Sequence, residues 1–453
     1  MTINDTIAAI ATPPGEGGLA VIRVSGPAAL AVADRCFKPA GAKASPPSAS
    51  PTHTMHYGHV VRDGRVVDEV LLAVMRAPRT FTVEDVVEVS CHGGVLAARR
   101  VLDALLAAGA RLAEPGEFTR RAFLNGRLDL AQAEAVADLI HARTDLALAA
   151  AREQLEGHLS RRIETLRDDL MSMLAHIEAH IDFPDEDIAP DTVEQLLERL
   201  ERAGRFMEAL IRTAEEGRVL RKGIRAAIVG RPNAGKSSLL NALLGEDRAI
   251  VTAQPGTTRD TIEETASIRG VPVVFVDTAG LREAQDEVEA EGIRRSRQAL
   301  ERAEVILHVL DGSEVMGGQR PDADPVPAKP RLWVINKSDL PRRLEGGDFE
   351  AASVAVSCLT GAGMETLKDR IRDMAGLGAV DHVEVAISAR HLDALNRGYK
   401  ALGNLMTCLR GDQTLELAAL ELRTAVGAVG EVVGKTTTED LLDAIFSQFC
   451  LGK

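Results

Sequence analysis

The chain has 453 residues, of which 45% are hydrophobic and 26% charged, and its formal net charge is −14. A chain of this length exceeds what one hydrophobic core supports, so we expect about two to four domains. The acidic balance argues against non-specific binding of nucleic acid, and we interpret two short basic stretches, 218–231 and 294–302, as solvated faces.

Targeting and redox features favour a cytoplasmic protein. The sequence has no apolar run of about 18 residues that would span a bilayer, and no basic start followed by an apolar segment. Its five cysteines form no C-x-x-C pair, so we expect reduced thiols and neither a disulfide framework nor a zinc site.

The first half of the chain changes character near residue 119. Residues 1–118 show a mixed α/β pattern, in which the apolar runs 19–24 and 86–90 predict strands. From 119 to 220 the composition shifts to Ala, Leu, Glu and Arg with helical apolar spacing, which is interrupted at Pro184. We therefore predict an N-terminal α/β domain followed by helices.

Strands and helices alternate over residues 221–379, and the helical pattern returns over 380–453. The short apolar runs suit the buried parallel strands of a doubly wound sheet, and they lie at 224–229, 271–276, 305–310 and 332–335. The economical fold class is α/β plus all-α, with a Ras-like doubly wound domain inserted into one discontinuous helical domain (119–220 and 380–453). Two separate helical bundles are the alternative.

A phosphate-binding loop opens the inserted domain. Gly230–Ser237 matches G-x-x-x-x-G-K-[ST] between a predicted strand and a predicted helix, which is the context the motif requires. Its glycines let backbone N–H groups surround phosphate oxygens, Lys236 would reach the β- and γ-phosphates, and Ser237 would bind magnesium. The predicted nucleotide-binding residues here are Asn233, Ala234, Gly235, Lys236, Ser237 and Ser238.

Three further motifs identify the nucleotide as GTP. Asp277-Thr278-Ala279-Gly280 ends a strand, where a carboxylate can hold magnesium through water and a Gly amide can sense the γ-phosphate. Asp339 in Asn336-Lys337-Ser338-Asp339 can accept from the ring N–H and the exocyclic amine of guanine, a pair of donors that adenine lacks. Thr258 is the predicted second magnesium ligand, and the loop behind the base is predicted at Ser357, Cys358 and Leu359.

Leu281 stands where Ras-type GTPases place a water-orienting Gln, and it cannot perform that role. Another residue must orient water, and a positive group must neutralise the developing charge. Arg259 and Arg282 are arginine-finger candidates from their charge alone. Asn233 is a candidate cation ligand, although its spacing alone favours a turn-tolerant residue.

Several longer segments resemble the tRNA-modification GTPase family usually called MnmE or TrmE, and the resemblance covers essentially the whole chain. The segments that carry it are Asp5–Gly15, Ile22–Gly26, Pro115–Val136, Ile181–Pro184, Gly256–Asp260 and Phe449–Lys453. The resemblance implies modification of carbon 5 of the wobble uridine of certain tRNAs, together with an FAD-dependent partner, MnmG, and a one-carbon folate. It also implies a homodimer, formed through the N-terminal domain, and a heterotetramer with MnmG.

The resemblance changes the interpretation of the hydrolytic residues. It implies that potassium and the pairing of two G domains replace an arginine finger, with Asn233, Thr252, Gln254 and Thr257 around the potassium ion. Glu289 matches the glutamate that orients water. The loop predicted to surround the nucleotide then comprises Thr252, Ala253, Gln254, Pro255, Gly256, Thr257 and Thr258.

The resemblance also implies a site for 5-formyltetrahydrofolate or a related one-carbon tetrahydrofolate in the N-terminal domain. Its predicted residues are Arg23, Glu84, Arg127 and Lys453. Many members of the family have Lys at the position of Arg127, so this chain keeps the positive charge there but not the same hydrogen-bonding geometry. Cys450 is the candidate residue of the modification chemistry, because a thiolate can attack a pyrimidine ring or carry a one-carbon unit. The alternative for Cys450 is a small buried hydrophobe.

Two other classes of GTPase are the alternatives to this interpretation. A ribosome-assembly switch also carries a Leu-like residue after Asp-x-x-Gly, but it normally appends an RNA-binding module, whereas this chain continues in helices. A membrane-transport GTPase would need membrane spans, which the sequence lacks.

Overall fold

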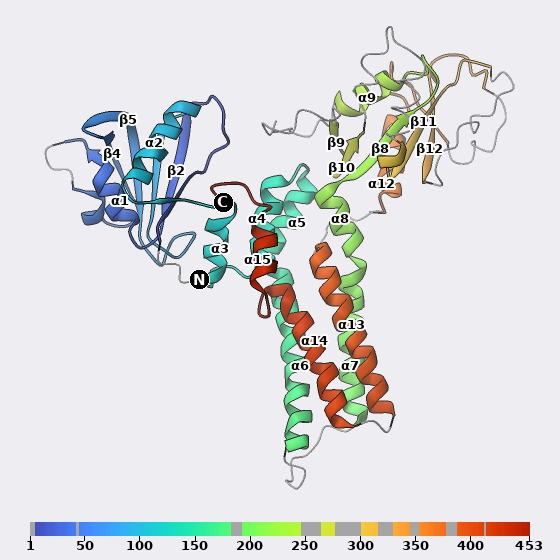
Figure 1. The fold of residues 1–453 in the computed structure, drawn as a ribbon. Coiled ribbons are helices and arrows are strands. Elements are labelled where there is room, and N and C mark those ends of the chain that lie inside the picture. The colour runs from blue at the N-terminus through green and yellow to red at the C-terminus, as the bar shows by residue number, and fades with distance from the viewer. Residues whose placement is uncertain are drawn as a thin grey trace. The chain divides into compact units, whose positions relative to one another are not determined.

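The computed structural model describes residues 5–41, 45–182, 193–245, 264–276, 300–315, 329–344, 353–376, 387–411 and 414–453. The chain forms two compact units (Figure 1). The first comprises Met1–Ala137, Ser160–Arg167 and Gly427–Lys453, and the second comprises Asp138–Leu159 and Asp168–Val426.

The first unit contains a seven-stranded sheet in the order β3-β4-β5-β6-β2-β1-β7. Neighbouring strands are antiparallel except β1 and β7, which are parallel. The strands are β1 (Ile7–Ile10), β2 (Leu19–Ser25), β3 (Phe37–Pro39), β4 (Thr54–Arg62), β5 (Arg65–Met75), β6 (Val86–His92) and β7 (Arg111–Leu112).

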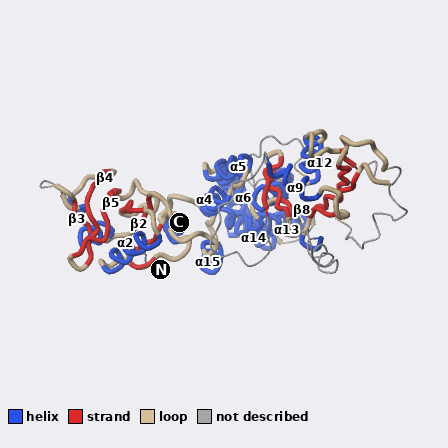
Figure 2. Tube along the Cα trace, turned by 90° about the horizontal axis from the view of Figure 1, so that it is seen from above, coloured by secondary structure: helices blue, strands red, loops and turns tan. Residues whose placement is uncertain are grey.

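Two helices, α1 (Ala29–Cys36) and α2 (Val95–Ala107), contact this sheet (Figure 1), and a short 3-10 helix, η1 (Pro47–Ala49), contacts α1. Figure 2 shows α2 beside the strands from above. Alternate residues of β2 point to opposite faces, so Ile22 and Val24 are buried while Arg23 between them is only half-buried. The strands predicted at 19–24 and 86–90 are β2 and β6, and the α/β prediction for this region is confirmed.

The first unit also holds α3 (Glu117–Leu124) and α15 (Glu439–Phe446), which pack together although they are far apart in sequence. Their contact includes Phe123 and Phe446, whose ring centroids lie 6.4 Å apart, and an ion pair of 2.8 Å between Arg120 and Asp443. The C-terminal segment is therefore an integral part of this unit.

A group of helices forms one part of the second unit. They include α5 (Asp145–Leu155), α7 (Val193–Arg212), α8 (Ala214–Lys222) and α13 (Ala389–Arg410), whereas α4 (Leu130–His141), α6 (His158–Asp182) and α14 (Leu415–Val433) have residues in both units. α7 and α13 lie side by side (Figure 1) and bury apolar stripes that include Leu200 and Met207 on α7, and Leu395 and Leu402 on α13.

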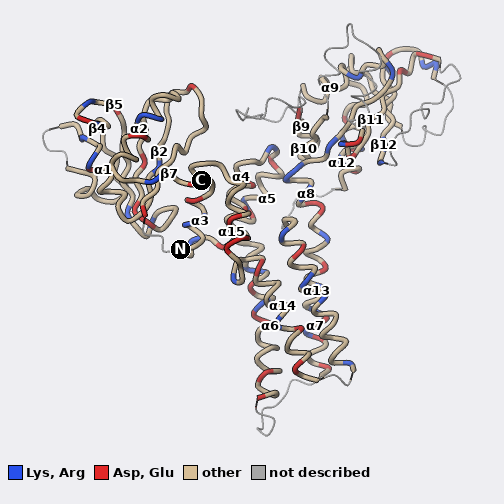
Figure 3. Tube along the Cα trace, in the orientation of Figure 1, with Lys and Arg blue, Asp and Glu red and all other residues tan. Residues whose placement is uncertain are grey.

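Charges of both signs alternate along these helices (Figure 3), and many are paired, as in Arg199–Asp169 at 2.6 Å. The predicted break at Pro184 lies outside the described residues. Helices from before and after the inserted sheet pack together, as the inserted arrangement predicts.

The inserted region is a six-stranded sheet in the order β13-β12-β11-β8-β10-β9, in which only β9 and β10 pair antiparallel. Its strands are β8 (Ile224–Val229), β9 (Glu264–Ile268), β10 (Val271–Phe275), β11 (Val305–Asp311), β12 (Arg331–Asn336) and β13 (Ser353–Ala355), and its described helices are α9 (Lys236–Gly245) and α12 (Met364–Met374). The four predicted strands are β8, β10, β11 and β12.

The order of this sheet reverses around β8, which has the later strands β10 and β11 on its two sides. In an open α/β sheet, ligands bind outside the carboxyl ends of the strands at such a switch point. The loop after β8 and the residues after β12 lie at that edge. The predicted fold class is confirmed, while the domain boundaries 118, 220 and 379 stay predictions.

Candidate functional site

The phosphate-binding loop connects β8 to α9 through residues that need unusual backbone conformations. Gly230, Asn233 and Gly235 have φ values of 150°, 62° and 94°. A Cβ atom added at Gly230 would lie 2.3 Å from the Val309 carbonyl oxygen of β11, so glycine is required at this crossing. Asn233 is exposed, and Asn is among the few residues that tolerate a positive φ.

Lys236 begins α9, and its ammonium folds back over the loop. Nζ donates hydrogen bonds of 2.9 Å to the carbonyls of Gly230 and Arg231. Burial lowers the pKa of Lys236 from its ordinary value. Ser237 and Ser238 are exposed in the first turn of the helix, whose N-terminus carries positive potential. The loop therefore offers a cation, backbone amides and hydroxyls to an anionic ligand.

Asn336, at the end of β12, joins the phosphate loop to the loop that follows β13. It is only 3% exposed, its Nδ2 donates to the Ala234 carbonyl at 3.0 Å, and its Oδ1 accepts from the Cys358 amide at 3.3 Å. A Cβ atom added at Gly235 would lie 2.1 Å from this Nδ2. Asn336 thus fixes the spacing between the two loops.

Asp339 is exposed and its carboxylate is held from one side. The buried Ser357 hydroxyl donates to its Oδ1 at 2.5 Å, and the Ser338 amide donates to the Val356 carbonyl at 3.0 Å. Cys358 is half-buried, and burial together with the nearby Asp339 raises the pKa of its thiol. The predicted loop residue Leu359 is 86% exposed. One face of the Asp339 carboxylate stays open to a ligand.

Asp311 is a site residue that the sequence interpretation missed. It ends β11, and its Oδ2 accepts a 2.5 Å hydrogen bond from Lys337, which has a positive φ of 63°. Burial favours a higher pKa for the Asp311 carboxyl, but hydrogen bonds from Lys337 and Ser313 outweigh it and lower the pKa. An acidic residue at the carboxyl end of a buried strand beside the Asn-Lys-Ser-Asp strand is the sequence signal that would have found it.

The structure thus brings together Asn233 to Ser238, Asn336 to Asp339 and Ser357 to Leu359 at one edge of the sheet. The other predicted nucleotide, metal and catalytic residues of this region lie outside the described residues, as do Arg259, Leu281 and Arg282. They are Thr252, Ala253, Gln254, Pro255, Gly256, Thr257, Thr258, Asp277, Thr278, Ala279, Gly280 and Glu289.

A second group of predicted residues lies in the first unit around α3. The Arg23 guanidinium stacks on the Phe118 ring at 5.6 Å, pairs with Glu88 at 2.8 Å and donates to the Gly452 carbonyl at 3.5 Å. Arg23 therefore contacts both the start of α3 and the C-terminal tail.

Glu84 lies on the connection between β5 and β6, and Arg127, which follows α3, contacts the same connection. Ser25 donates to Glu84 Oε2 at 2.6 Å, and the Thr80 hydroxyl donates to the Glu84 carbonyl at 2.7 Å. Arg127 is exposed, donates to the Thr80 carbonyl, and lies 5.4 Å from the centroid of the Phe81 ring. The two residues share Thr80 as a neighbour without touching each other.

The C-terminal tail is docked in place. The Phe118 amide donates to the Lys453 carbonyl at 3.2 Å, and the Gly116 amide donates to the Cys450 carbonyl at 3.4 Å. A Cβ atom at Gly452 would lie 2.4 Å from the Ile10 carbonyl oxygen of β1, so the tail passes close against the sheet. The Cys450 thiol is exposed, which is contrary to the buried alternative for this residue.

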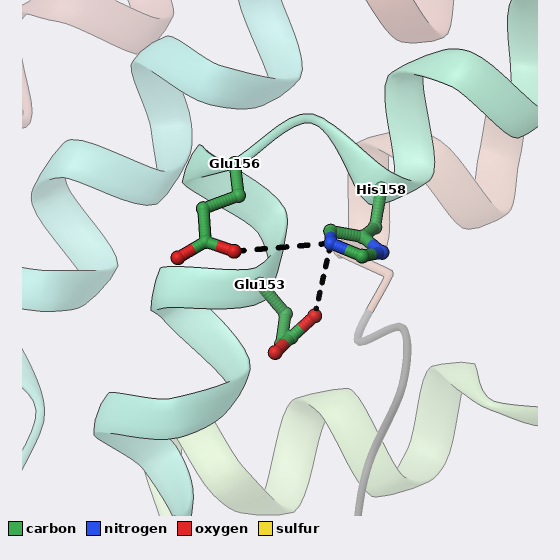
Figure 4. A group of neighbouring side chains, drawn as sticks. All are labelled: Glu153, Glu156 and His158. Carbon is green, nitrogen blue, oxygen red and sulfur yellow. Dashed lines mark ion pairs between the residues drawn. The ribbon is translucent and has the colours of Figure 1, made fainter.

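One group of potential metal ligands occurs among the described residues, at the corner between α5 and α6. His158 Nε2 lies 3.2 Å from Glu153 and 3.8 Å from Glu156 (Figure 4). Glu156 also pairs with Arg152 at 3.4 Å, and all these side chains are substantially exposed. We interpret the group as ion pairs that fix the helix corner. No helix of the described residues is long and apolar enough to cross a membrane.

Comparisons with known proteins match the chain from end to end. A family model of the GTP-binding protein TrmE N-terminus matches residues 6–127, and one of the MnmE helical domain matches residues 130–450. The tRNA modification GTPase MnmE of Heliobacterium modesticaldum is 48% identical and that of Geobacillus thermodenitrificans 46%, each with full coverage of both chains. The enzyme of the same name from Bacillus velezensis is 44% identical over 99% of this chain and 100% of its own.

The doubly wound sheet, the glycine-rich loop before α9 and the polar residues after β12 define a P-loop GTP-binding protein. The family matches to the N-terminal domain and to the helical domain, which lie before and around that sheet, narrow this class. The chain belongs to the MnmE family of tRNA modification GTPases.

Proposed function

We propose that this protein is the GTP-hydrolysing component of a cytoplasmic complex that adds a (carboxymethyl)aminomethyl group to carbon 5 of the wobble uridine of certain tRNAs. The observation that carries the proposal is membership of the family over the full length of the chain. In this proposal the protein acts as a homodimer that joins the FAD-dependent MnmG in a heterotetramer and works on tRNA.

The guanine-binding role of Asp339 follows from its environment. Its open carboxylate face would accept from the ring N–H and exocyclic amine of guanine, while the Ser357 hydroxyl keeps it oriented. A site built to accept from two donors disfavours a base that lacks them, because the charged carboxylate would lose water on binding and gain no hydrogen bond in return. The nucleotide is therefore GTP and not ATP.

The phosphate end would hold and position the reacting group. Lys236 would exchange its two loop carbonyls for β- and γ-phosphate oxygens, which are stronger acceptors, and the loop amides would donate to the same phosphates. Ser237 and Thr258 are the residues proposed to hold magnesium, which neutralises charge on the phosphates. Asp277 would act through water on that ion, and Gly280 would sense the γ-phosphate.

Potassium is the cation proposed to take the place of an arginine finger. Asn233 fits this role because its amide is exposed on the phosphate loop, and the carbonyl oxygen of an amide is a suitable ligand for a hard cation. Thr252, Gln254 and Thr257 would complete the ligand set, and Glu289 would orient the attacking water when two G domains pair.

The first unit is the proposed site for a one-carbon tetrahydrofolate such as 5-formyltetrahydrofolate. Its residues suit that group: Glu84 would accept from N–H donors such as those of a pterin ring, while Arg23, Arg127 and Lys453 would supply cations for the glutamate carboxylates. Arg23 contacts the carbonyl of Gly452, next to Lys453 in the tail. Cys450, exposed in the same tail, is the proposed nucleophile of the modification chemistry.

The proposed function is tested by analysing wobble nucleosides of tRNA from cells that lack this protein. We expect the C5-modified uridines to disappear, to return with the wild-type protein, and not to return with Lys236→Ala. Normal nucleosides combined with a defect in ribosomal subunit assembly would contradict the proposal and favour the ribosome-assembly switch. A GTPase rate that is the same in potassium and sodium would remove the role of Asn233 alone.

A further inference from the structure

The helix α3 clamps the segment that carries Glu84. Arg121 and Asn125 lie four residues apart and so share one face of the helix end. Arg121 donates to the Glu84 carboxylate at 3.1 Å, and Asn125 donates to the Thr82 carbonyl at 2.6 Å. Val83, which lies between Thr82 and Glu84, is β-branched and has a φ of 64°. This conformation is unfavourable for a free chain, so the two contacts from α3 help to hold it.

Arg121 cannot reach a ligand itself. The residue is 2% exposed, and its guanidinium donates to Glu117 at 2.9 Å and to the Asp5 carboxylate and carbonyl at 2.6 and 2.9 Å. Burial favours a lower pKa for Arg121, but its three carboxylate neighbours raise it, so the side chain stays charged. A buried, paired cation of this kind can act on a ligand only through the groups that it holds.

The Glu84 carboxylate is fixed at both oxygens. Ser25, the last residue of β2, donates to Oε2, and Arg121 donates to Oε1. A glutamate held at only one oxygen would be free to adopt several rotamers. Ligand binding would then have to restrict it to one, at a cost in conformational entropy. These two hydrogen bonds therefore preorganise the Glu84 carboxylate for ligand binding.

The same helix carries the other half of the site. The amides of Gly116 and Phe118, at its start, donate to the carbonyls of Cys450 and Lys453. Arg23 stacks on the ring of Phe118. The same helix therefore holds both Glu84 and the C-terminal tail, through residues that lie about one helical turn apart.

We propose that Arg121 is the positioning residue of the folate site, which holds the Glu84 carboxylate in the orientation that binds the ligand and sets it relative to the tail. This inference rests on the proposed folate function. It assigns a role in ligand binding to a buried ion pair that would otherwise be considered only a contribution to stability.

Arg111 provides a matched control because it belongs to the same network without contacting Glu84. It pairs with Asp5 at 2.8 Å and with Glu117 at 2.6 Å. We expect Arg121→Met in the full-length protein to weaken 5-formyltetrahydrofolate binding at least tenfold by calorimetry. Arg111→Met should change it less than threefold, and both variants should keep wild-type GTP affinity. An equal loss of folate affinity in both variants would overturn the proposal.

A double-mutant cycle separates positioning from general stability. If Arg121 acts through Glu84, then Glu84→Gln weakens folate binding strongly in the wild type. In the Arg121→Met background, the same substitution should weaken folate binding by less than a further threefold. If the loss of folate affinity in the double variant equalled the product of the losses in the two single variants, Arg121 would not act through Glu84 and the proposal would be overturned. Should Arg121→Met fail to fold, the same cycle with Arg121→Lys, which keeps the charge but not the paired bonds, gives the answer. Failure of the wild type to bind folate would instead reject the proposed folate function itself.

Discussion

Replacing Asn336 with Ala tests whether the two nucleotide-binding loops are held together by one side chain. The substitution removes both the donor to Ala234 and the acceptor for the Cys358 amide. A buried polar group left without a partner costs about 1–3 kcal/mol. Ala234 is buried, while Cys358 is half-buried and can gain water, so we expect a total near 2–4 kcal/mol.

This cost would be measured as weaker GTP binding, because the nucleotide must order loops that are no longer connected. At about 1.4 kcal/mol per tenfold change, GTP affinity should fall about 30- to 700-fold by calorimetry. Asn404→Ala, at an exposed position of α13 outside the nucleotide-binding loops, is the control and should bind GTP normally. An Asn336→Ala protein that bound GTP within threefold of the wild type and melted at the same temperature would refute this reasoning.

Three other predictions concern the glycine loop, the thiols and the acidic network. Gly235→Ala places a Cβ atom 2.1 Å from Asn336 Nδ2 and should abolish GTP binding in a nucleotide-exchange assay. Iodoacetamide at pH 8 should label the exposed Cys450 well before the buried Cys91, because burial and a nearby carboxylate raise the pKa of Cys91 to about 11. Mass spectrometry that showed the reverse order would contradict the exposure of the Cys450 thiol. Burial favours a higher pKa for Glu117, but hydrogen bonds from two arginines lower it, so its stabilisation is present above its unfolded pKa and is lost as pH falls through the folded value. Glu117→Gln should therefore lower the melting temperature at pH 7 and have much less effect near pH 3; an equal effect at both would be contrary evidence.

The parts of the site that sequence could predict are those in which spacing alone dictates geometry. Gly230 to Ser237 and Asn336 to Asp339 each follow a buried strand, so their side chains had to lie at the carboxyl edge of the sheet. The segments that carry Thr258 and Asp277 were predicted on the same grounds and stay predictions.

The parts that sequence alone could not predict depend on contacts between distant segments. Lys337 meets Asp311 only because β11 and β12 are neighbours in the sheet. Arg121 meets Asp5 across 116 residues, and Gly452 crosses Ile10 at the first strand. No periodicity or motif spacing encodes these approaches, so the family resemblance, and not the residue pattern, pointed to Arg23, Glu84 and Lys453.

The central claim is that this protein selects guanine through the carboxylate of Asp339. The most direct test is calorimetric titration of the full-length protein with GTP and with ATP, in the presence of magnesium. We predict GTP binding that is at least a hundredfold tighter than ATP binding, since the unpaired acceptor costs about 3 kcal/mol or more with adenine. Equal affinity for the two nucleotides would contradict the account.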